Sequence, residues 1–165
     1  MDLINKDLLG LKDITKEEIE LILDTATTMK ALIKSKSKKA PHLNGKTIIS
    51  LFYENSTRTK VSFELAAKYL SGTISNVSIA TSSVNKGETL IDTGNTIDAM
   101  GTDVVIIRHP NSGAPELLSK NIKASVINAG DGMNEHPTQA LLDIFTMKEH
   151  FGALDGLRVS ILGDI

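Results

Sequence analysis

Apolar residues follow two spacings along this chain, one typical of helices and the other typical of buried strands. Residues 15–18 read Thr-Lys-Glu-Glu, a capping box, and apolar residues then recur three and four positions apart as far as Ile33, which predicts a first helix. Later runs of consecutive apolar residues, many of them β-branched, predict strands that are buried on both faces. These strands are expected over residues 46–52, 73–79, 103–107, 124–128 and 157–163. Further helices are expected over residues 57–70, 88–100, 114–119 and 137–151.

Strands that alternate with helices predict an α/β fold, here a doubly wound parallel sheet of about five strands with helices on both faces. In the helix over residues 57–70, we expect Val61, Leu65 and Tyr69 to form one apolar stripe. Residues 1–150 are expected to form one domain. Residues 151–165 would then hold the last strand and the start of a link to a second domain that is absent.

Composition narrows the class of protein. A length of 165 residues, with 41% hydrophobic and 23% charged residues, is ordinary for one globular domain. Eighteen Lys and Arg against 20 Asp and Glu leave a net charge of -2, which argues against binding to nucleic acid or a membrane mainly by charge. The basic run over residues 34–39 is interpreted as a solvated loop, with nucleic-acid contact the less favoured alternative. Since the chain shows neither a long apolar run nor a secretory signal, we expect a cytoplasmic protein.

The chain lacks the sequence motifs of several classes of functional site. The absence of cysteine excludes disulfides, cysteine-based zinc sites, iron–sulfur clusters and thiol nucleophiles. Gly130-Asp131-Gly132 supplies the first two glycines of a dinucleotide-binding fingerprint but lacks the third, and no phosphate-binding P-loop sequence occurs. The spacing of histidines and carboxylates predicts no metal site. We therefore expect no cofactor.

Arginine is rare in this chain, and its positions point to a ligand site. Among 18 cationic residues only Arg58, Arg108 and Arg158 are arginine, a residue suited to holding anions with a planar fork of donors. Arg58 and Arg108 follow predicted strands, as do His109 and His136. Ligands of open α/β sheets bind beyond the carboxyl ends of the strands, so we expect a site there, although loops are polar in any case.

Two helix starts supply the candidate chemistry. Ser56, Thr57, Arg58 and Thr59 begin a helix, where free backbone N–H groups, hydroxyls and a guanidinium together suit a phosphate group. The alternative is simple capping of the helix by Asn55 or Ser56.

At the second start, His136 precedes Pro137, and Gln139 lies one turn further on, so both polar side chains can face the same crevice. A lone histidine is more often structural, and for His109 the two interpretations are equally open.

Three of these segments resemble the signatures of the aspartate/ornithine carbamoyltransferase family. Residues 52–64 (FYENSTRTKVSFE) resemble its carbamoyl-phosphate motif, and residues 108–110 (RHP) and 136–139 (HPTQ) are similar to its other two signatures. Residues 82–89 (SSVNKGET) and 128–132 (NAGDG) look like the aspartate branch. The resemblance spans nearly the whole chain, with the motifs in the same order.

The resemblance implies transfer of a carbamoyl group from carbamoyl phosphate to the amine of L-aspartate, in a homotrimer whose active sites lie between subunits, with possible regulatory chains. It implies a carbamoyl-phosphate-binding domain here and an aspartate-binding domain that is missing. Matching positions assign phosphate or carbamoyl binding to Ser56, Thr57, Arg58, Thr59, Arg108, His136 and Gln139. Ser82 and Lys86 would reach into the neighbouring subunit's site, and Glu54 would pair with arginines of the second domain.

Two alternatives stay open at this point. One is another carbamoyltransferase, such as the ornithine enzyme, because the missing domain selects the acceptor amine. The other is a non-catalytic module that binds carbamoyl phosphate and assembles without turnover, which is also the expected limit of this fragment on its own.

Overall fold

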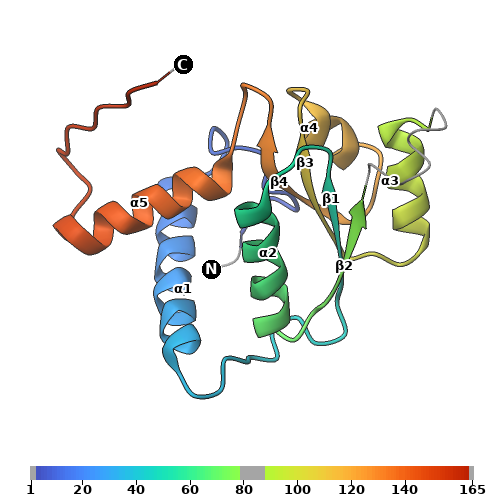
Figure 1. Cartoon of the computed structure of the whole chain (residues 1–165). Helices are drawn as coiled ribbons and strands as arrows, with labels where there is room; N and C mark the ends of the chain where they lie inside the picture. The colour runs from blue at the N-terminus through green and yellow to red at the C-terminus, as the bar shows by residue number, and fades with distance from the viewer. Residues whose placement is uncertain (1–2, 79–87, 164–165) are drawn as a thin grey trace.

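The computed structural model describes residues 3–78 and 88–163, which form a parallel four-stranded sheet between two layers of helices (Figure 1). The strands, in the spatial order β2-β1-β3-β4, are β1 (Thr47–Phe52), β2 (Thr73–Ser78), β3 (Val104–His109) and β4 (Ser125–Asp131). The helices are α1 (Lys16–Lys34), α2 (Thr57–Tyr69), α3 (Leu90–Ala99), α4 (Ala114–Ser119) and α5 (Pro137–Phe151). None of the helices in these described ranges is long and apolar enough to cross a membrane.

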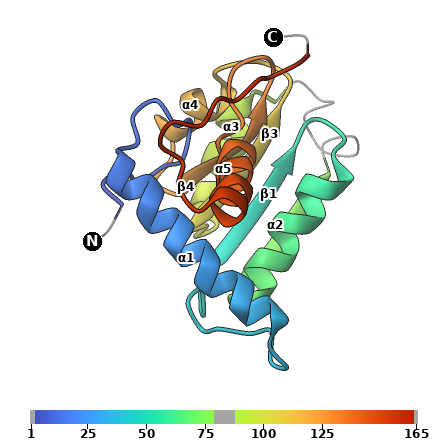
Figure 2. The ribbon, with the colours of Figure 1, turned by 90° about the vertical axis from the view of Figure 1, so that its left-hand side faces the viewer.

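Successive residues of each strand face opposite layers, and this alternation builds two apolar cores. On β1, Ile48 and Phe52 pack in one cluster with Ala67 of α2, while Leu51 packs in the other with Ile97 of α3 and Leu118 of α4. Figure 2 shows α1, α2 and α5 in front of the sheet, and α3 and α4 lie behind it. The prediction of an α/β sheet with helices on both faces is confirmed.

The strand order reverses its direction of winding between β1 and β3. The chain leaves β1 into α2 on one face, whereas it leaves β3 into α4 on the other face (Figure 1). Because β1 and β3 are neighbours, their following loops diverge and leave room beyond their carboxyl ends. The predicted polar segments therefore lie where open α/β sheets bind ligands.

The predicted fifth strand, over residues 157–163, is wrong. This segment lies in no strand, and the side chains of Val159 and Ile161 are 59% and 74% exposed. The outer edge of β4 is already paired, because Leu8 donates its N–H to Val126 O (2.9 Å) and accepts from Asn128 N (2.9 Å). The apolar run thus finds no partner strand among the described residues, and Figure 1 shows it leading away from the sheet.

The apolar stripe predicted for α2 is not the face of the helix that packs on the sheet. Val61 and Leu65 are exposed, whereas Phe63 and Ala67 face the sheet and pack with Ile48 of β1. Both sets of residues have helical spacing, so periodicity alone could not choose between them. The packing places the small side chain of Ala67 where the helix comes close to the strands.

The element boundaries agree closely with the sequence patterns elsewhere. Thr15 caps α1 through its hydroxyl, which accepts from Glu18 N (3.2 Å), and Glu18 accepts from Thr15 N (3.0 Å) in return. Ile4 N also donates to Glu18 (2.8 Å), and these backbone hydrogen bonds lower the pKa of this carboxyl. The capping box therefore also anchors the N-terminal segment.

Gly94 offers a direct test of the packing between α3 and α4. A Cβ atom at Gly94 would lie 2.4 Å from Leu118 Cδ1 and 3.3 Å from Ile122 Cγ2, and Leu118 is fully buried. We expect Gly94→Val to lower the free energy of unfolding by about 1–3 kcal/mol in urea titrations, because the new atoms overpack this core. Asn95→Val, on the exposed face of the same helix, is the matched control and should change stability by less than about 0.5 kcal/mol. Equal stability of the two variants would contradict this account of the α3–α4 contact.

Candidate anion-binding site

The first turn of α2 has backbone N–H donors to which its N-cap side chain, Ser56, does not bind. Ser56 is the N-cap residue by position, yet its side chain makes no capping hydrogen bond. Its hydroxyl instead lies 2.9 Å from Thr59 Oγ1 and donates to it. The alternative of simple capping by Ser56 therefore finds no support here. The amides of the first turn, the Thr57 hydroxyl and the exposed Arg58 side chain are available to an anion.

Arg108 extends from the end of β3 between the ends of β1 and β4. Its Nε atom lies 3.2 Å from Glu54 Oε2, which makes an ion pair, although the N–H is not aligned for a hydrogen bond. Its Nη1 atom donates to Ala129 O (3.0 Å). Held on two sides, the guanidinium is fixed in place and keeps further N–H groups for a ligand.

Gly130 brings Arg108 and His136 together. Its φ is +115°, and a Cβ atom there would lie 2.6 Å from Arg108 Nη1 and 3.3 Å from His136 Cδ2. A side chain at this position would therefore collide with the guanidinium and press on the imidazole. The close approach of backbone to both side chains requires glycine.

His136 is the N-cap residue of α5, as its position before Pro137 predicts. Partial burial, followed by the positive charge of Arg108, holds the pKa of His136 below its ordinary value. The imidazole is therefore uncharged at neutral pH and carries one N–H donor. Such a group can donate to an oxygen without adding charge to the site.

Gln139 lies in the first turn of α5, and its Nε2 atom donates to Asp143 Oδ1 (3.0 Å). This contact orients the amide and leaves its oxygen as an acceptor. An acceptor one turn beyond His136 suits an –NH₂ group of a ligand.

Two predicted residues have local partners. His109 Nδ1 accepts from Asn111 N (2.9 Å), and its ring packs 4.5 Å from that of Tyr53, so the structure favours a structural role for His109. Burial lowers the pKa of His109 as well. Glu54, expected to pair with arginines of another domain, has Arg108 as its ion-pair partner within the described residues.

Ser82 and Lys86, which the resemblance places in the site of a neighbouring subunit, lie outside the described residues. Their roles stay predictions.

Sequence reasoning missed the importance of Asn128 and Asp131. Both are buried polar residues, 1% and 2% exposed, at the end of β4, and they are hydrogen-bonded to each other. The sequence offered one signal: Asp131 stands between two glycines directly after an apolar run. Its burial is unusual for an acidic residue.

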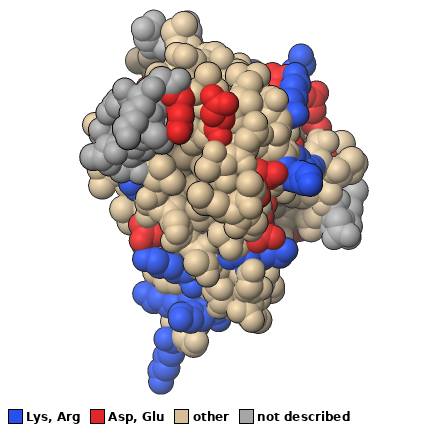
Figure 3. All heavy atoms as spheres, turned by 90° about the vertical axis from the view of Figure 1, so that its right-hand side faces the viewer, with Lys and Arg blue, Asp and Glu red and all other residues tan. Residues whose placement is uncertain are grey.

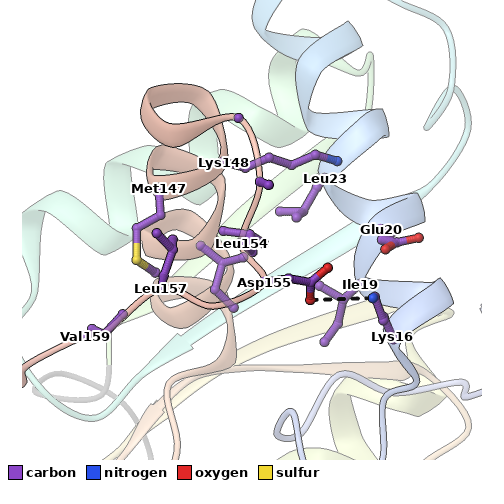
Figure 4. Close-up of a pocket in the computed structure, with 13 residues that line it drawn as sticks. Lys16, Ile19, Glu20, Leu23, Met147, Lys148, Leu154, Asp155, Leu157 and Val159 are labelled. Atoms are coloured by element: carbon purple, nitrogen blue, oxygen red, sulfur yellow. Dashed lines mark ion pairs between the residues drawn. The ribbon is translucent and has the colours of Figure 1, made fainter.

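A separate cavity of about 570 Å³ lies between α1, α5 and the segment that follows α5 (Figure 4). Figure 4 shows mainly apolar side chains facing it, with Lys16 and Asp155 forming an ion pair at 3.8 Å. Because apolar groups dominate and the charges there are of both signs, this cavity does not suit a small anion. The candidate site is the group of polar side chains at the carboxyl ends of the strands.

Charge is mixed over the face of the molecule that Figure 3 shows. Basic groups gather at its lower end, and acidic groups are interspersed with basic ones above them. This face does not resemble the continuous basic surface with which proteins bind nucleic acid.

Comparisons with known proteins agree with the motifs. Residues 6–149 match the family described as aspartate/ornithine carbamoyltransferase, carbamoyl-P binding domain. The chain is 70% identical to the aspartate carbamoyltransferase catalytic subunit of Acetivibrio thermocellus over 165 residues, which are 100% of this chain and 53% of that relative. The chain thus spans about half the length of this relative.

Solved structures show the same likeness. The catalytic subunit of M. jannaschii aspartate transcarbamoylase superposes with a TM-score of 0.85 at 45% identity, over 93% of this chain and 50% of that one. Aspartate transcarbamoylase from Trypanosoma cruzi, solved in complex with carbamoyl phosphate and aspartate, has a TM-score of 0.87 at 36% identity, over 93% of this chain and 48% of that one.

The lowered pKa values of His109 and His136 predict how stability depends on pH. Below the ordinary pKa of 6.5, these histidines bind protons in the unfolded chain but not in the folded chain. Their contribution to the free energy of unfolding is therefore full above about pH 6.5 and declines as the pH falls towards the folded-state pKa values. Urea titrations should therefore give a larger free energy of unfolding at pH 7 than at about pH 5.5. His136→Gln should reduce this difference. Equal pH dependence in the parent and in His136→Gln would contradict the prediction.

Proposed function

Since the chain belongs to the aspartate/ornithine carbamoyltransferase family, we propose that it binds carbamoyl phosphate and serves the transfer of its carbamoyl group to the amine of L-aspartate. The observation that supports this proposal is that three kinds of donor lie at the carboxyl ends of the strands: the start of α2, Arg108 fixed between β1 and β4, and uncharged His136. The names of the relatives favour aspartate over ornithine as the acceptor.

The phosphate group would lie at the start of α2. Backbone N–H groups, the hydroxyls of Ser56, Thr57 and Thr59, and the guanidinium of Arg58 can all donate to its oxygens. Arg108 would contact both the phosphate and the carbonyl oxygen. Gln139, with its oxygen free to accept, would hold the carbamoyl –NH₂ group.

The reaction needs donors where negative charge develops. The neutral amine of aspartate attacks the carbonyl carbon, and negative charge develops on the carbonyl oxygen. The bond to phosphate then breaks, and the nitrogen gives up one proton to the departing phosphate. Thr59, Arg108 and His136 would stabilise that oxygen because their donors are already in place before the reaction. An uncharged His136 would donate without holding the ground state as tightly as a cation would.

The proposal includes the assembly of this chain into an oligomer. We propose a homotrimer with shared active sites, in which Ser82 and Lys86 of one chain contribute to the site of its neighbour. Regulatory chains would bind to this trimer. The exposed Val61 and Leu65 of α2 support a protein contact on that face, because they form an apolar stripe that the described residues leave uncovered. By itself, this chain would be limited to binding and assembly.

Ligand binding gives the first test. Carbamoyl phosphate or inorganic phosphate should raise the melting temperature of the chain, by the equivalent of about 2.7 kcal/mol at 100 times the dissociation constant, because only the folded state binds it. Arg58→Ala should abolish this shift. Arg158→Ala, which removes an exposed arginine from the segment after α5, is the matched control and should keep it. An Arg58→Ala variant that is stabilised as much as the parent would overturn the phosphate assignment.

Turnover tests the role of His136. In a chain completed with the second half of the Acetivibrio thermocellus relative, His136→Ala should lower kcat on the order of 100–1000-fold, the usual cost of one lost donor to a developing oxyanion. The dissociation constant of carbamoyl phosphate should change far less. His150→Ala, an exposed histidine at the end of α5, should leave both values unchanged. If His136→Ala leaves kcat unchanged, His136 is only a helix cap.

A further inference from the structure

Asp131 is a buried carboxylate that the proposed reaction does not use. Its side chain, at the end of β4, is 2% exposed and accepts four hydrogen bonds. Oδ1 accepts from Asn128 Nδ2 (2.8 Å) and Glu135 N (3.0 Å), and Oδ2 accepts from Gly113 N (2.7 Å) and Asn134 Nδ2 (3.0 Å). All four donors are uncharged amides, so oriented hydrogen bonds stabilise the carboxylate, which has no ion pair within residues 3–78 and 88–163.

The four donors come from separate parts of the site. Gly113 is the N-cap residue of α4, Asn128 lies in β4, and Glu135 directly precedes His136. A second pair of contacts closes the loop, since Asp131 N donates to Glu135 O (3.1 Å) and Gly132 N donates to His109 O (3.0 Å). The carboxylate thus joins the end of β4 to the starts of α4 and α5, and the backbone bond from Gly132 ties the same loop to the end of β3.

The same network reaches both Arg108 and His136. Asn128 Oδ1 accepts from Gly130 N (2.9 Å), which holds the positive φ of Gly130 beneath the two side chains. Ala129 O, one residue earlier, accepts from Arg108 Nη1. Any shift of residues 129–135 would therefore move Ala129, which binds the Arg108 guanidinium, and Glu135, which directly precedes His136.

We propose that Asp131 is a positioning residue for the anion site, where its carboxylate holds the loop over residues 129–135 so that Arg108 and His136 face the same ligand. This inference rests on the proposed function, because it concerns the same site. It assigns Asp131 no contact with the ligand.

The ionisation of Asp131 is consistent with this role. Burial acts to raise the pKa of the carboxyl, but hydrogen bonds from Asn128, Gly113, Asn134 and Glu135 outweigh it, and the pKa lies below its ordinary value. The group is therefore ionised at neutral pH and accepts at both oxygens. An asparagine there would turn an –NH₂ group towards two of the four donors and leave them without an acceptor.

Asp131→Asn is the principal variant, and Asp103→Asn is its matched control. Asp103 likewise accepts from a backbone amide, Thr47 N (2.8 Å), and from Lys46 Nζ (2.8 Å), but it lies at the amino ends of the strands. Both variants lose a carboxylate that supports the sheet, and only one of them lies beside the site.

Isothermal titration of the folded proteins with inorganic phosphate measures the effect. Asp131→Asn should weaken phosphate affinity on the order of 10–100-fold, which is the usual effect on metal affinity when a hydrogen-bond partner of a metal ligand is removed. Asp103→Asn should match the parent. If the parent binds phosphate and Asp131→Asn binds it equally well, the positioning role is overturned while the proposed function stands. A parent that binds no phosphate overturns the proposed function.

A second readout is independent of ligand. The imidazole resonances of His136 in heteronuclear NMR spectra, and their pH titration, should shift in Asp131→Asn and stay unchanged in Asp103→Asn. Unchanged resonances in both variants would overturn the proposal even if phosphate does not bind.

Should Asp131→Asn fail to fold, Asn134→Ala removes one of the four donors from an exposed residue. It should still shift the His136 resonances, and no shift would count against the proposal.

Discussion

The parallel pairing of β1 with β3 is the contact on which the rest of the molecule depends. It places Phe52 beside Arg108 in register, and Tyr53 N donates to Arg108 O (2.9 Å) just beyond the strand ends. Because the segments that follow β1 and β3 turn to opposite faces of the sheet, the start of α2 and the side chain of Arg108 both lie at the carboxyl ends of these strands. A different strand order would separate the same residues, whatever their chemistry.

Close approach of the backbone to charged groups is the second constraint. Arg108 is held between Glu54 and Ala129 O, and the absence of a side chain at Gly130 lets the guanidinium and His136 come together. Preorganisation of this kind is what electrostatic catalysis requires, because donors that are already in place need no reorganisation as charge develops. Burial, together with the charge of Arg108, also keeps His136 uncharged, so the cationic Arg108 stands beside a neutral donor.

The apolar surfaces of the chain are as informative as its polar crevice. Val61 and Leu65 on α2, and the cavity between α1 and α5, expose groups that a self-contained domain would ordinarily cover. The chain spans about half the length of its relatives, and assembly with further protein surface is consistent with both features.

Local patterns in the sequence determined most of the secondary structure and the identity of the candidate groups. The capping box at Thr15, the β-branched run of β3 and Pro137 at the start of α5 act through neighbours in the chain, so they could be interpreted without a fold. The tertiary structure decided what depends on partners far along the chain: which stripe of α2 is buried, that Leu8 and not the segment over residues 157–163 pairs with β4, and that Asp131 joins four amides. Helical spacing and apolar runs look the same in the sequence whether a face is buried or exposed. Which face is buried depends on how whole elements compete for one sheet edge or one core.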